Sequence, residues 1–461
     1  MRPRQPFITW KSSGRSDPLR VLGINPWIYD FAAFNVWSRP AGLLCCLDMF
    51  SRSGADTALA DFMDRMVPGP HWPRAAATGR GHYPKTFLPK PWVLKNIPRQ
   101  YSRYGLARDM SAQALSGLDP APDLILVTSL MTYWYPGVGS AIKMARQIFP
   151  EAKICLGGIY ATLCREHAEA MGADLVVSGP LERPDNWARV WSLAGRAAPA
   201  LPDQAGLALD TSYYRDPEFS LIMGSRGCPF NCPYCASSRL YNGFRQADPA
   251  RVIKGIRQDY ERGVRDFAFY DDALLVNPEK MLYPVLDFII ESKYNLRLHA
   301  PNALHIRYLT PQICRLLKRA GLVTVRLGLE TADFRQRQDH KLDFRQWRKG
   351  VANLLEAGFS RQDLVVYVMA GLPGQQDREI IKTVREVLSL GIRPELNHYS
   401  PIPGTPMFER AVEESTFPLD DPLCHNNSIW PCVAGGFSWE GKKRWQEAVQ
   451  QVLQLKMTLL E

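Results

Sequence analysis

The sequence predicts an α/β protein built as an N-terminal doubly wound parallel sheet, a partial barrel of six strand–helix units, and a C-terminal helical extension. Short apolar runs alternate with helical patterns between residues 20 and 185, which is typical of a parallel sheet covered by helices. The alternation resumes near residue 218 and continues to about 410. Residues 186–217 between them are rich in Pro, Gly and polar side chains and read as a linker.

Length and composition fit this organisation. A chain of 461 residues is long enough for about two or three domains. Hydrophobic residues make up 46% and charged residues 22%, as in a soluble globular protein. The sequence contains no run of about eighteen apolar residues, and its first residues are polar. We therefore expect a cytoplasmic protein with no membrane partner. Ten cysteines in a chain of this size do not indicate a secreted disulfide framework.

The N-terminal elements begin after a polar tail, residues 1–19. We expect a strand at 21–25, a helix over 42–53, a strand at 123–128, a helix at 138–149, and further strands at 153–156 and 173–177. Ligands of such sheets bind at the carboxyl ends of the strands. The loops expected there are 25–30, 129–136 and the Gly157–Gly158 turn.

The second half alternates more regularly. Expected strands cover 219–223, 266–270, 296–299, 323–328, 364–369 and 395–399, and helices follow each of the first five, the last of these over 377–390. Six units instead of eight make an open barrel, and barrel chemistry lies at the carboxyl ends of the strands. The polar candidates at those ends are Asp271–Asp272, Asn302, Glu330–Thr331, Gly371–Gly374 and 400–405.

The strongest chemical signal is a loop with the spacing C-x3-C-x2-C, formed by Cys228, Cys232 and Cys235. Gly227, Pro229 and Pro233 interrupt regular helix, so the loop must wrap. Three thiolates on a wrapping loop suit a four-iron cluster, and the fourth iron stays open to a substrate or cofactor. A three-cysteine zinc site and three buried thiols are the alternatives, although zinc sites usually draw on two separated ligand pairs.

This loop, with an aromatic residue before its last cysteine, resembles that of the radical S-adenosylmethionine (radical SAM) enzymes. The resemblance implies a [4Fe–4S] cluster, SAM bound to its open iron, and reductive cleavage of SAM to a 5′-deoxyadenosyl radical. It further implies a partial TIM barrel, in which Tyr234, Glu330 and the Gly371-Leu-Pro-Gly turn contact SAM. Asp271 and Asp272 stand where many relatives carry Gly-Gly-Glu, which binds the SAM amino group.

Our candidate site residues in this half follow from the same positions. The metal ligands are Cys228, Cys232 and Cys235, and the residues assigned to catalysis are Asp272 and Tyr270. The remaining candidates bind the cofactor: Tyr234, Asp271, Asn302, Glu330, Thr331, Gly371, Pro373 and Ser400.

Residues 20–185 resemble the Rossmann-like cobalamin-binding domain that precedes the radical SAM domain in one large subfamily. The parallel depends on the strand order and the GG-x-x-AT turn at 157–162. The subfamily's D-x-H-x-x-G element is missing, because no His occurs from Met1 to Val67. We therefore expect cobalamin without a histidine ligand, above the aromatic residues Trp27, Tyr29, Phe31 and Phe34. The cobalamin-binding candidates are Asn25, Met131, Thr132, Tyr133, Gly157, Gly158, Tyr160 and Thr162.

The leading functional interpretation is a cobalamin-dependent methyltransferase acting on an unactivated centre. The first alternative is a radical SAM enzyme that transfers no methyl group and keeps the front domain as a scaffold. A non-catalytic cobalamin or SAM sensor has no use for an open iron, and methylthiolation of transfer RNA would need further domains. The resemblance implies a monomer that takes a small-molecule substrate, receives electrons from flavodoxin or ferredoxin, and binds no nucleic acid.

Two further segments stand out. An insert at residues 65–108 carries nine Lys and Arg residues and no Asp or Glu, which favours either an entrance for an anionic substrate or a surface connection. The C-terminal extension, 411–461, holds Cys424, His425 and Cys432, whose spacing matches no familiar metal site. We expect its last helix over 439–459.

Overall fold

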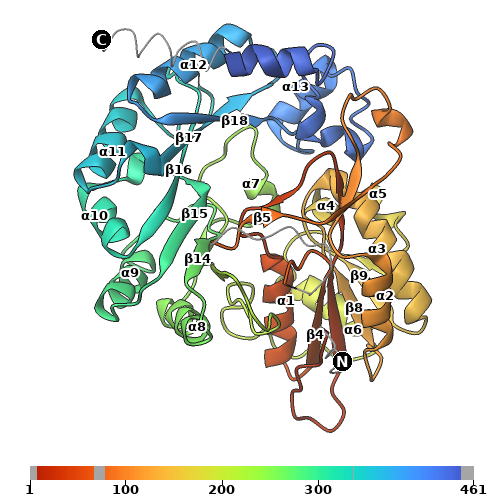
Figure 1. Ribbon diagram of the computed structural model, residues 1–461. Helices are drawn as coiled ribbons and strands as arrows, with labels where there is room; N and C mark the ends of the chain where they lie inside the picture. The colour runs from red at the N-terminus through yellow and green to blue at the C-terminus, as the bar shows by residue number, and fades with distance from the viewer. Residues whose placement is uncertain (1–7, 67–77, 336, 448–461) are drawn as a thin grey trace, which may run out of the picture. The chain divides into compact units, whose positions relative to one another are not determined.

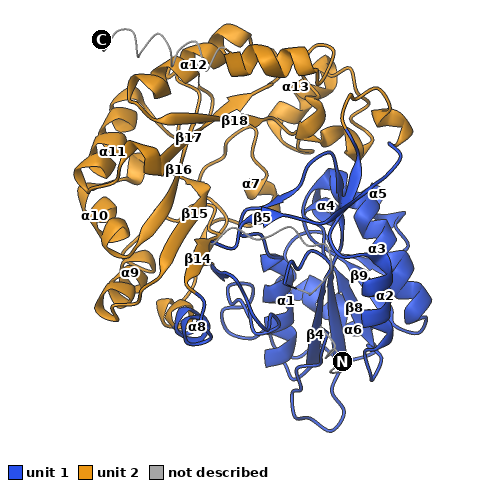
Figure 2. Ribbon diagram, viewed as in Figure 1, with its two compact units in different colours: residues 1–90, 100–221, 254–264 blue, residues 91–99, 222–253, 265–461 orange. Residues whose placement is uncertain are grey.

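The computed structural model describes residues 8–66, 78–335 and 337–447. The chain divides into two compact units, coloured separately in Figure 2. Unit 1 comprises residues 1–90, 100–221 and 254–264, and unit 2 comprises residues 91–99, 222–253 and 265–461. No helix within the described residues is long and apolar enough to cross a membrane.

Unit 1 contains a five-stranded sheet in the order β10-β9-β8-β1-β4 (Figure 1). The paired strands are parallel, which confirms the predicted class of this sheet. Because β1 lies between β4 and β8, the direction of winding changes between β1 and β8, where doubly wound sheets bind ligands. Its strands are β1 (Arg20–Asn25), β4 (Asp56–Asp61), β8 (Leu124–Val127), β9 (Lys153–Leu156) and β10 (Leu175–Val176).

Helices cover this sheet and bury its apolar residues. The aromatic ring of Phe50 in α1 lies 4.8 Å from that of Trp187 in α6, so these two helices pack together. Leu22, Ile24, Ile125 and Ile154 are inaccessible to solvent in the central cluster. The helices are α1 (Ala41–Arg52), α2 (Arg108–Ser116), α3 (Tyr135–Ile148), α4 (Ile159–Leu163), α5 (Arg165–Glu169) and α6 (Pro184–Leu193).

Short strands organise the described parts of the basic insert. β2 (Ile28–Asp30), β7 (Ser102–Tyr104) and β6 (Lys85–Phe87) form one antiparallel sheet, and β3 (Phe34–Asn35) pairs with β5 (Gly81–His82). The insert is therefore folded onto the loop that follows β1. Residues 91–99 belong to unit 2, where the indole of Trp439 donates a hydrogen bond of 2.9 Å to the Pro98 carbonyl.

The six-stranded sheet has the order β11-β14-β15-β16-β17-β18, which is the sequence order of a partial barrel. Figure 1 shows α9 to α12 along the outer side of this curved sheet. The predicted fold class is confirmed, and so is each of its six expected strands. They are β11 (Ser220–Ile222), β14 (Asp266–Phe269), β15 (Arg297–Leu304), β16 (Leu322–Glu330), β17 (Leu364–Ala370) and β18 (Arg393–His398).

The helices of this half also follow the expected positions. α10 begins at a Thr310 cap and α11 at an Asp343 capping box, as the sequence signals for helix starts indicate. The expected last helix, 439–459, lies partly outside the described residues. The helices are α7 (Ser237–Leu240), α8 (Pro249–Glu261), α9 (Leu282–Glu291), α10 (Pro311–Arg319), α11 (Phe344–Glu356), α12 (Asp377–Ser389) and α13 (Pro406–Glu414).

Two parts of unit 1 differ from the sequence-based expectation. The strand β4, with the sequence DTALAD, was not predicted because its end residues are acidic. Residues 8–19 are not a loose polar tail throughout. Ile8 is buried, the Trp10 indole donates to the Pro120 carbonyl at 2.9 Å, and Lys11 forms a bridge with Thr57.

Candidate active site

The cysteine loop is held at its base by a small antiparallel pair. β12 (Ser225–Arg226) pairs with β13 (Arg245–Gln246), and the three cysteines lie between these strands in the sequence. Gly227 has φ of +79°, and a Cβ there would lie 2.2 Å from the Gly243 carbonyl oxygen. Only glycine fits such a position, which explains why Gly precedes the first cysteine.

The three thiols suit a cluster better than a single ion. All are free, Cys232 is buried, and Cys228 and Cys235 are half-buried. Burial raises the pKa of Cys228, and that of Cys232 to about 11, and the charge of Cys235 adds to both increases. Within the described residues no three metal-ligating side chains are grouped tightly enough to hold one metal ion. In a four-iron cluster each thiolate binds a different iron, so the sulfurs stand farther apart.

The two neighbouring aspartates after β14 have different roles. Asp271 is 3% exposed, and its carboxylate accepts hydrogen bonds from Ser225 Oγ at 2.6 Å and from the Gly224 amide at 3.2 Å. It therefore braces the start of the cysteine loop, and burial raises its pKa to about 7. Asp272 instead lines the pocket beside the loop and accepts a hydrogen bond of 3.1 Å from Ser237 Oγ.

Glu330 ends β16 in an unfavourable backbone conformation. Its φ is +63°, a region that side chains other than glycine rarely adopt, and a register shift precedes it. Such strain persists where the surrounding structure imposes it and is frequent at functional sites. The Glu330 carboxylate accepts a hydrogen bond of 3.2 Å from Lys341 Nζ. The predicted cofactor residue Glu330 is thus fixed in direction by its backbone and by a cation.

Lys341 belongs to a buried charge network that connects to the cysteine loop. Its Nζ lies 3.9 Å from Asp339, and Asp339 forms an ion pair of 2.7 Å with Arg337. Burial alone lowers the pKa of Lys341, but Glu330 and the Cys232 thiolate outweigh it and raise the net value. The Tyr234 hydroxyl donates to Asp339 at 2.8 Å. Through this hydrogen bond the Tyr234 side chain anchors the cysteine loop to Asp339.

A pocket of about 420 Å³ opens beside the loop within unit 2. Three of its ten lining residues, Cys228, Asp272 and Asn302, were predicted from the sequence. The missed polar ones have no motif that marks them as site residues, although His305 and Asn397 are at or just after strand ends. The seven missed residues are Ser237, Pro301, Ala303, His305, Lys341, Tyr367 and Asn397.

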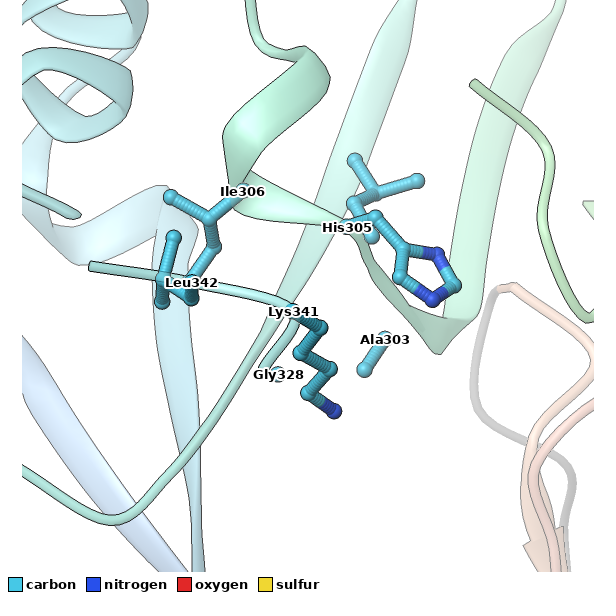
Figure 3. A pocket seen from close by; sticks show the side chains of 7 residues that line it. Ala303, His305, Ile306, Gly328, Lys341 and Leu342 are labelled. Atoms are coloured by element: carbon cyan, nitrogen blue, oxygen red, sulfur yellow. The ribbon is translucent and has the colours of Figure 1, made fainter. Parts of the chain in front are cut away.

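A smaller adjoining pocket shows how two of these residues are placed. Figure 3 shows His305 and Lys341 on one side of it and Ile306 and Leu342 on the other. Burial lowers the pKa of His305 to about 4, and the charge of Lys341 adds to this effect, so the imidazole is neutral at physiological pH. The polar wall of the site therefore contains one fixed ammonium group and one neutral ring.

The other predicted residues of unit 2 lie at strand ends, and several already have internal partners. Asn302 donates to the Tyr270 carbonyl at 3.2 Å, which ties the ends of β14 and β15 together. Thr331 accepts from the Asp333 amide at 3.1 Å, and Ser400 donates to the His425 carbonyl at 2.5 Å. Gly371 has φ of +77°. The Pro373 carbonyl accepts from Arg410 at 3.2 Å.

The C-terminal His425 has a structural role. It is 1% exposed, and its Nε2 donates to the Leu419 carbonyl at 2.9 Å. Cys424 is fully buried, and burial raises its pKa to about 12, which keeps the thiol protonated. Nothing in this geometry favours a second metal site.

The carboxyl edge of the unit 1 sheet contains a buried hydrogen-bond network. The Asn25 side chain donates to Asp61 at 2.6 Å, and the Tyr214 hydroxyl donates to the other Asp61 oxygen at 2.7 Å. Arg39 lies 3.8 Å from Asp61 and 2.9 Å from Asp64. Asn25 was predicted to bind a cofactor, and the structure shows its amide group bound to Asp61.

The Gly157–Gly158 turn brings the ends of β8 and β9 together. Gly158 has φ of +98°, and a Cβ there would lie 2.4 Å from the Ser129 carbonyl oxygen. Gly157, in contrast, has open space where its Cβ would be. Tyr160 is buried, and its hydroxyl is hydrogen-bonded to His167 Nδ1 at 2.6 Å. The Thr162 hydroxyl donates a hydrogen bond of 2.8 Å to the Gly158 carbonyl. Gly157 is therefore the position of this turn that a flat ligand could approach.

The expected aromatic floor after β1 is largely absent. Trp27 and Phe31 are buried, and the Tyr29 hydroxyl is bonded to Ser140 at 3.1 Å, because β2 is covered by its pairing with β7. Phe34 is 45% exposed, and the ring of His82 meets it edge-on at 4.8 Å. The loop after β1 contains no histidine of its own, and the insert places the imidazole of His82 against it.

The segment after β8 presents one of its three candidates to solvent. Met131 is 42% exposed, whereas Thr132 and Tyr133 are buried. Burial raises the pKa of Tyr133 far above its usual range, and the charge of Asp30 adds to this effect. Of these three candidates, Met131 is thus the one whose side chain is exposed to a ligand.

The barrel, its strained carboxylate and its three-thiol loop define the class of an iron–sulfur enzyme with its chemistry at the carboxyl ends of the strands. Residues 222–387 match the family model of the radical SAM superfamily. This match identifies a radical SAM domain in the barrel half of the chain.

Two curated relatives match parts of the chain. It is 25% identical to the anaerobic magnesium-protoporphyrin IX monomethyl ester cyclase of Cereibacter sphaeroides over 338 residues, 64% of this chain and 54% of the relative. It is also 25% identical to an uncharacterized methyltransferase of Pyrococcus horikoshii over 198 residues, 42% of each chain. The chain spans about half of these relatives' own length.

A solved structure is similar over most of the chain. It is the radical SAM methyltransferase TsrM of Kitasatospora setae, with cobalamin and a [4Fe–4S] cluster bound. The TM-score is 0.60 at 16% identity, and the match covers 87% of this chain and 80% of that one. At this identity the similarity establishes the fold.

Proposed function

We propose that this protein is a cobalamin-dependent radical SAM methyltransferase acting on an unactivated centre. The observation that carries the proposal is the joint presence of the three-cysteine loop, with a pocket beside it, and a doubly wound sheet with the strand order β10-β9-β8-β1-β4. A methyltransferase name on one relative and the similarity to the TsrM fold support it. When bound, cobalamin would supply a carrier for the methyl group and SAM would supply the radical.

The residues of unit 2 divide the work of holding SAM. The three thiolates would ligate the cluster, and Glu330 would accept from the ribose or amino group of SAM. Lys341 stands 3.2 Å from Glu330 and supplies a cation for the SAM carboxylate in the same pocket. Asp272 faces this pocket and would meet the SAM amino group, while Tyr270 and Asn302 fix the strand ends beside it.

In unit 1 we propose that cobalamin lies over the carboxyl ends of β1, β8 and β9. Met131 is exposed there and Gly157 has open space where a Cβ would be, and a macrocycle can be held by packing and backbone contacts. We propose that no nitrogen of the protein ligates cobalt, with His82 as the described imidazole that could prove this wrong. Electron paramagnetic resonance of bound cob(II)alamin decides it, since nitrogen splitting that disappears in His82→Ala would refute the proposal.

The substrate and partners are also proposals. The insert carries Lys85 and Lys95 exposed, and an anionic small molecule is the substrate class that such cations attract. An external electron donor such as flavodoxin or ferredoxin would reduce the cluster. We propose that the protein is cytoplasmic, because an oxygen-sensitive cluster requires a reducing compartment. We also propose that it is a monomer.

A radical SAM enzyme without methyl transfer is the second candidate. It is favoured by one observation, that the relative covering 64% of this chain is named a cyclase. In that case unit 1 would serve as a scaffold, and the pocket residues would keep the same roles toward SAM.

The deciding experiment needs no knowledge of the substrate. The full chain is purified anaerobically with cobalamin, reduced, and incubated with SAM labelled in its methyl group. The methyltransferase proposal predicts label in the cobalamin fraction together with S-adenosylhomocysteine. Production of 5′-deoxyadenosine with no label in that fraction would favour the second candidate.

A further inference from the structure

His305 touches the cysteine loop, and the proposed function gives it no role. It follows the last residue of β15, and its Nε2 lies 3.9 Å from the Sγ of Cys228. This distance is within the range of a hydrogen bond to sulfur, which is longer than one to oxygen. The ring also lines the pocket that holds Cys228 and Asp272.

Aromatic packing fixes the direction of the imidazole. The ring of His305 is stacked on that of Phe230, with centroids 4.9 Å apart and planes 23° apart. Phe230 itself lies between Cys228 and Cys232 in the sequence, so the stacking joins His305 to the cysteine loop. The guanidinium of Arg307 lies 5.8 Å from the Phe230 centroid. Figure 3 shows the His305 ring projecting from the end of its strand.

An N–H group at this place would affect the cluster through its sulfur. The Nε2 atom is the imidazole nitrogen that lies 3.9 Å from the sulfur, so a proton on Nε2 would be donated to it. Reduction adds negative charge to the cluster, and part of that charge resides on the thiolate sulfurs. A hydrogen bond to such a sulfur stabilises the reduced state more than the oxidised one, which raises the reduction potential.

We propose that His305 is a positioning residue that donates its Nε2–H to the Cys228 thiolate and so raises the reduction potential of the cluster. The inference depends on the cluster and not on the proposed methyl transfer. It concerns the same single electron that the external donor supplies, and no additional reactant is needed. The stacked Phe230 holds the donor in place, and the pocket stays open beside it.

The first test is a redox titration followed by electron paramagnetic resonance, with iron and sulfide counts on each sample. His305→Phe keeps a ring against Phe230 and removes both nitrogens, and it should make reduction about tenfold less favourable, a shift of about 59 mV to more negative potential for a one-electron couple. His305→Gln restores an amide N–H and should recover most of the shift. The matched control is Tyr308→Phe, on the neighbouring turn and 6.5 Å from His305, which should leave the potential unchanged.

A potential in His305→Phe equal to that of the unaltered protein, at equal iron content, would overturn the proposal. An equal shift in Tyr308→Phe would also do so, because the effect would then be general packing. A second measurement needs no variant. Nitrogen-15 labelled histidine in the unaltered, reduced protein should give a weak hyperfine coupling to the cluster. A strong coupling, from nitrogen bound directly to iron, or no coupling at all, would contradict a hydrogen bond to sulfur.

Discussion

The carboxyl edges of the two sheets use their polar residues in opposite ways. In unit 2 the barrel edge holds Glu330 in a strained conformation, with Lys341 beside it and Asp272 facing a pocket. In unit 1 the corresponding edge ties Asn25 to Asp61 in a buried network, so these two side chains are already hydrogen-bonded within the protein. The two edges share the α/β pattern but differ in what they leave accessible.

This difference indicates two modes of binding. A cationic sulfonium with an amino and a carboxylate group requires fixed charges, which the barrel edge provides. A large macrocycle such as cobalamin can be bound by shape and backbone contacts, which the Gly157 turn and the exposed Met131 permit. Variants should therefore have large, specific effects at the barrel edge and smaller effects in unit 1.

The largest effect is expected from the cysteine loop. Changing Cys228, Cys232 or Cys235 to Ala removes one of three thiolates, so the cluster should become labile and SAM cleavage should be lost. The measurement is iron content together with 5′-deoxyadenosine formation. Cys164→Ala, a half-buried cysteine of unit 1, is the control and should keep both. A triple variant that still formed 5′-deoxyadenosine would contradict the assignment of this edge.

Lys341→Met should have the next largest effect. The change removes the cation shared by Glu330 and Asp339, and the loss of a hydrogen bond to a charged group costs about 1.5–3 kcal/mol. We expect SAM to bind roughly ten- to a hundredfold more weakly in equilibrium dialysis. Lys349→Met, an exposed position of α11, should bind SAM normally. Equal affinity in both variants would mean that the network is structural and does not serve SAM.

The sequence predicted this edge in part. Cys228, Cys232 and Cys235 are recognisable because their spacing is local, and Glu330 because it ends an apolar run. Lys341 and His305 were missed because they lie in loops, and only the folded chain brings them beside the cysteines. The only available signal was that His305 directly follows a strand. In unit 1, the hydrogen bond of Asn25 to Asp61 could not be predicted. Asp61 ends the strand β4, and this strand was not recognised because both of its end residues are acidic.

Charge reversal in the insert tests whether its cations serve the substrate. The triple change Lys85→Glu, Lys90→Glu and Lys95→Glu should raise the Michaelis constant for the methyl acceptor about threefold or more, since each exposed ionic contact contributes about 0.2–1 kcal/mol. The effect should shrink at high salt. The control is Lys143→Glu in α3. An unchanged Michaelis constant at low salt would mean that the insert is a structural connection and does not attract the substrate.

A smaller effect, on the pH dependence of stability, is expected from Asp271, which supports the cysteine loop and does not line the pocket. Its folded pKa of about 7 is above the unfolded value of 3.8, so the folded state keeps a proton that the unfolded state has released. The free energy of unfolding should therefore fall as pH rises through this interval, by at most about 1.4 kcal/mol per pH unit. Asp271→Asn should lose this dependence in denaturant titrations from pH 5 to pH 8.

The matched control for Asp271 is Asp287→Asn, an exposed position of α9. It should keep the pH dependence of the unaltered protein. If Asp271→Asn lost stability with rising pH as steeply as the unaltered protein does, another group would be responsible, and Asp271 would contribute nothing through its proton.

The most direct test of the account is a metal count on the two edges in one experiment. The full chain and its triple Cys228, Cys232 and Cys235 to Ala variant are prepared anaerobically with iron, sulfide and cobalamin, and iron and cobalt are measured per chain. We predict about four irons and one cobalt in the unaltered protein, and one cobalt without iron in the variant, because the two sites are built separately. Iron without cobalt in the unaltered protein would contradict the proposed role of unit 1.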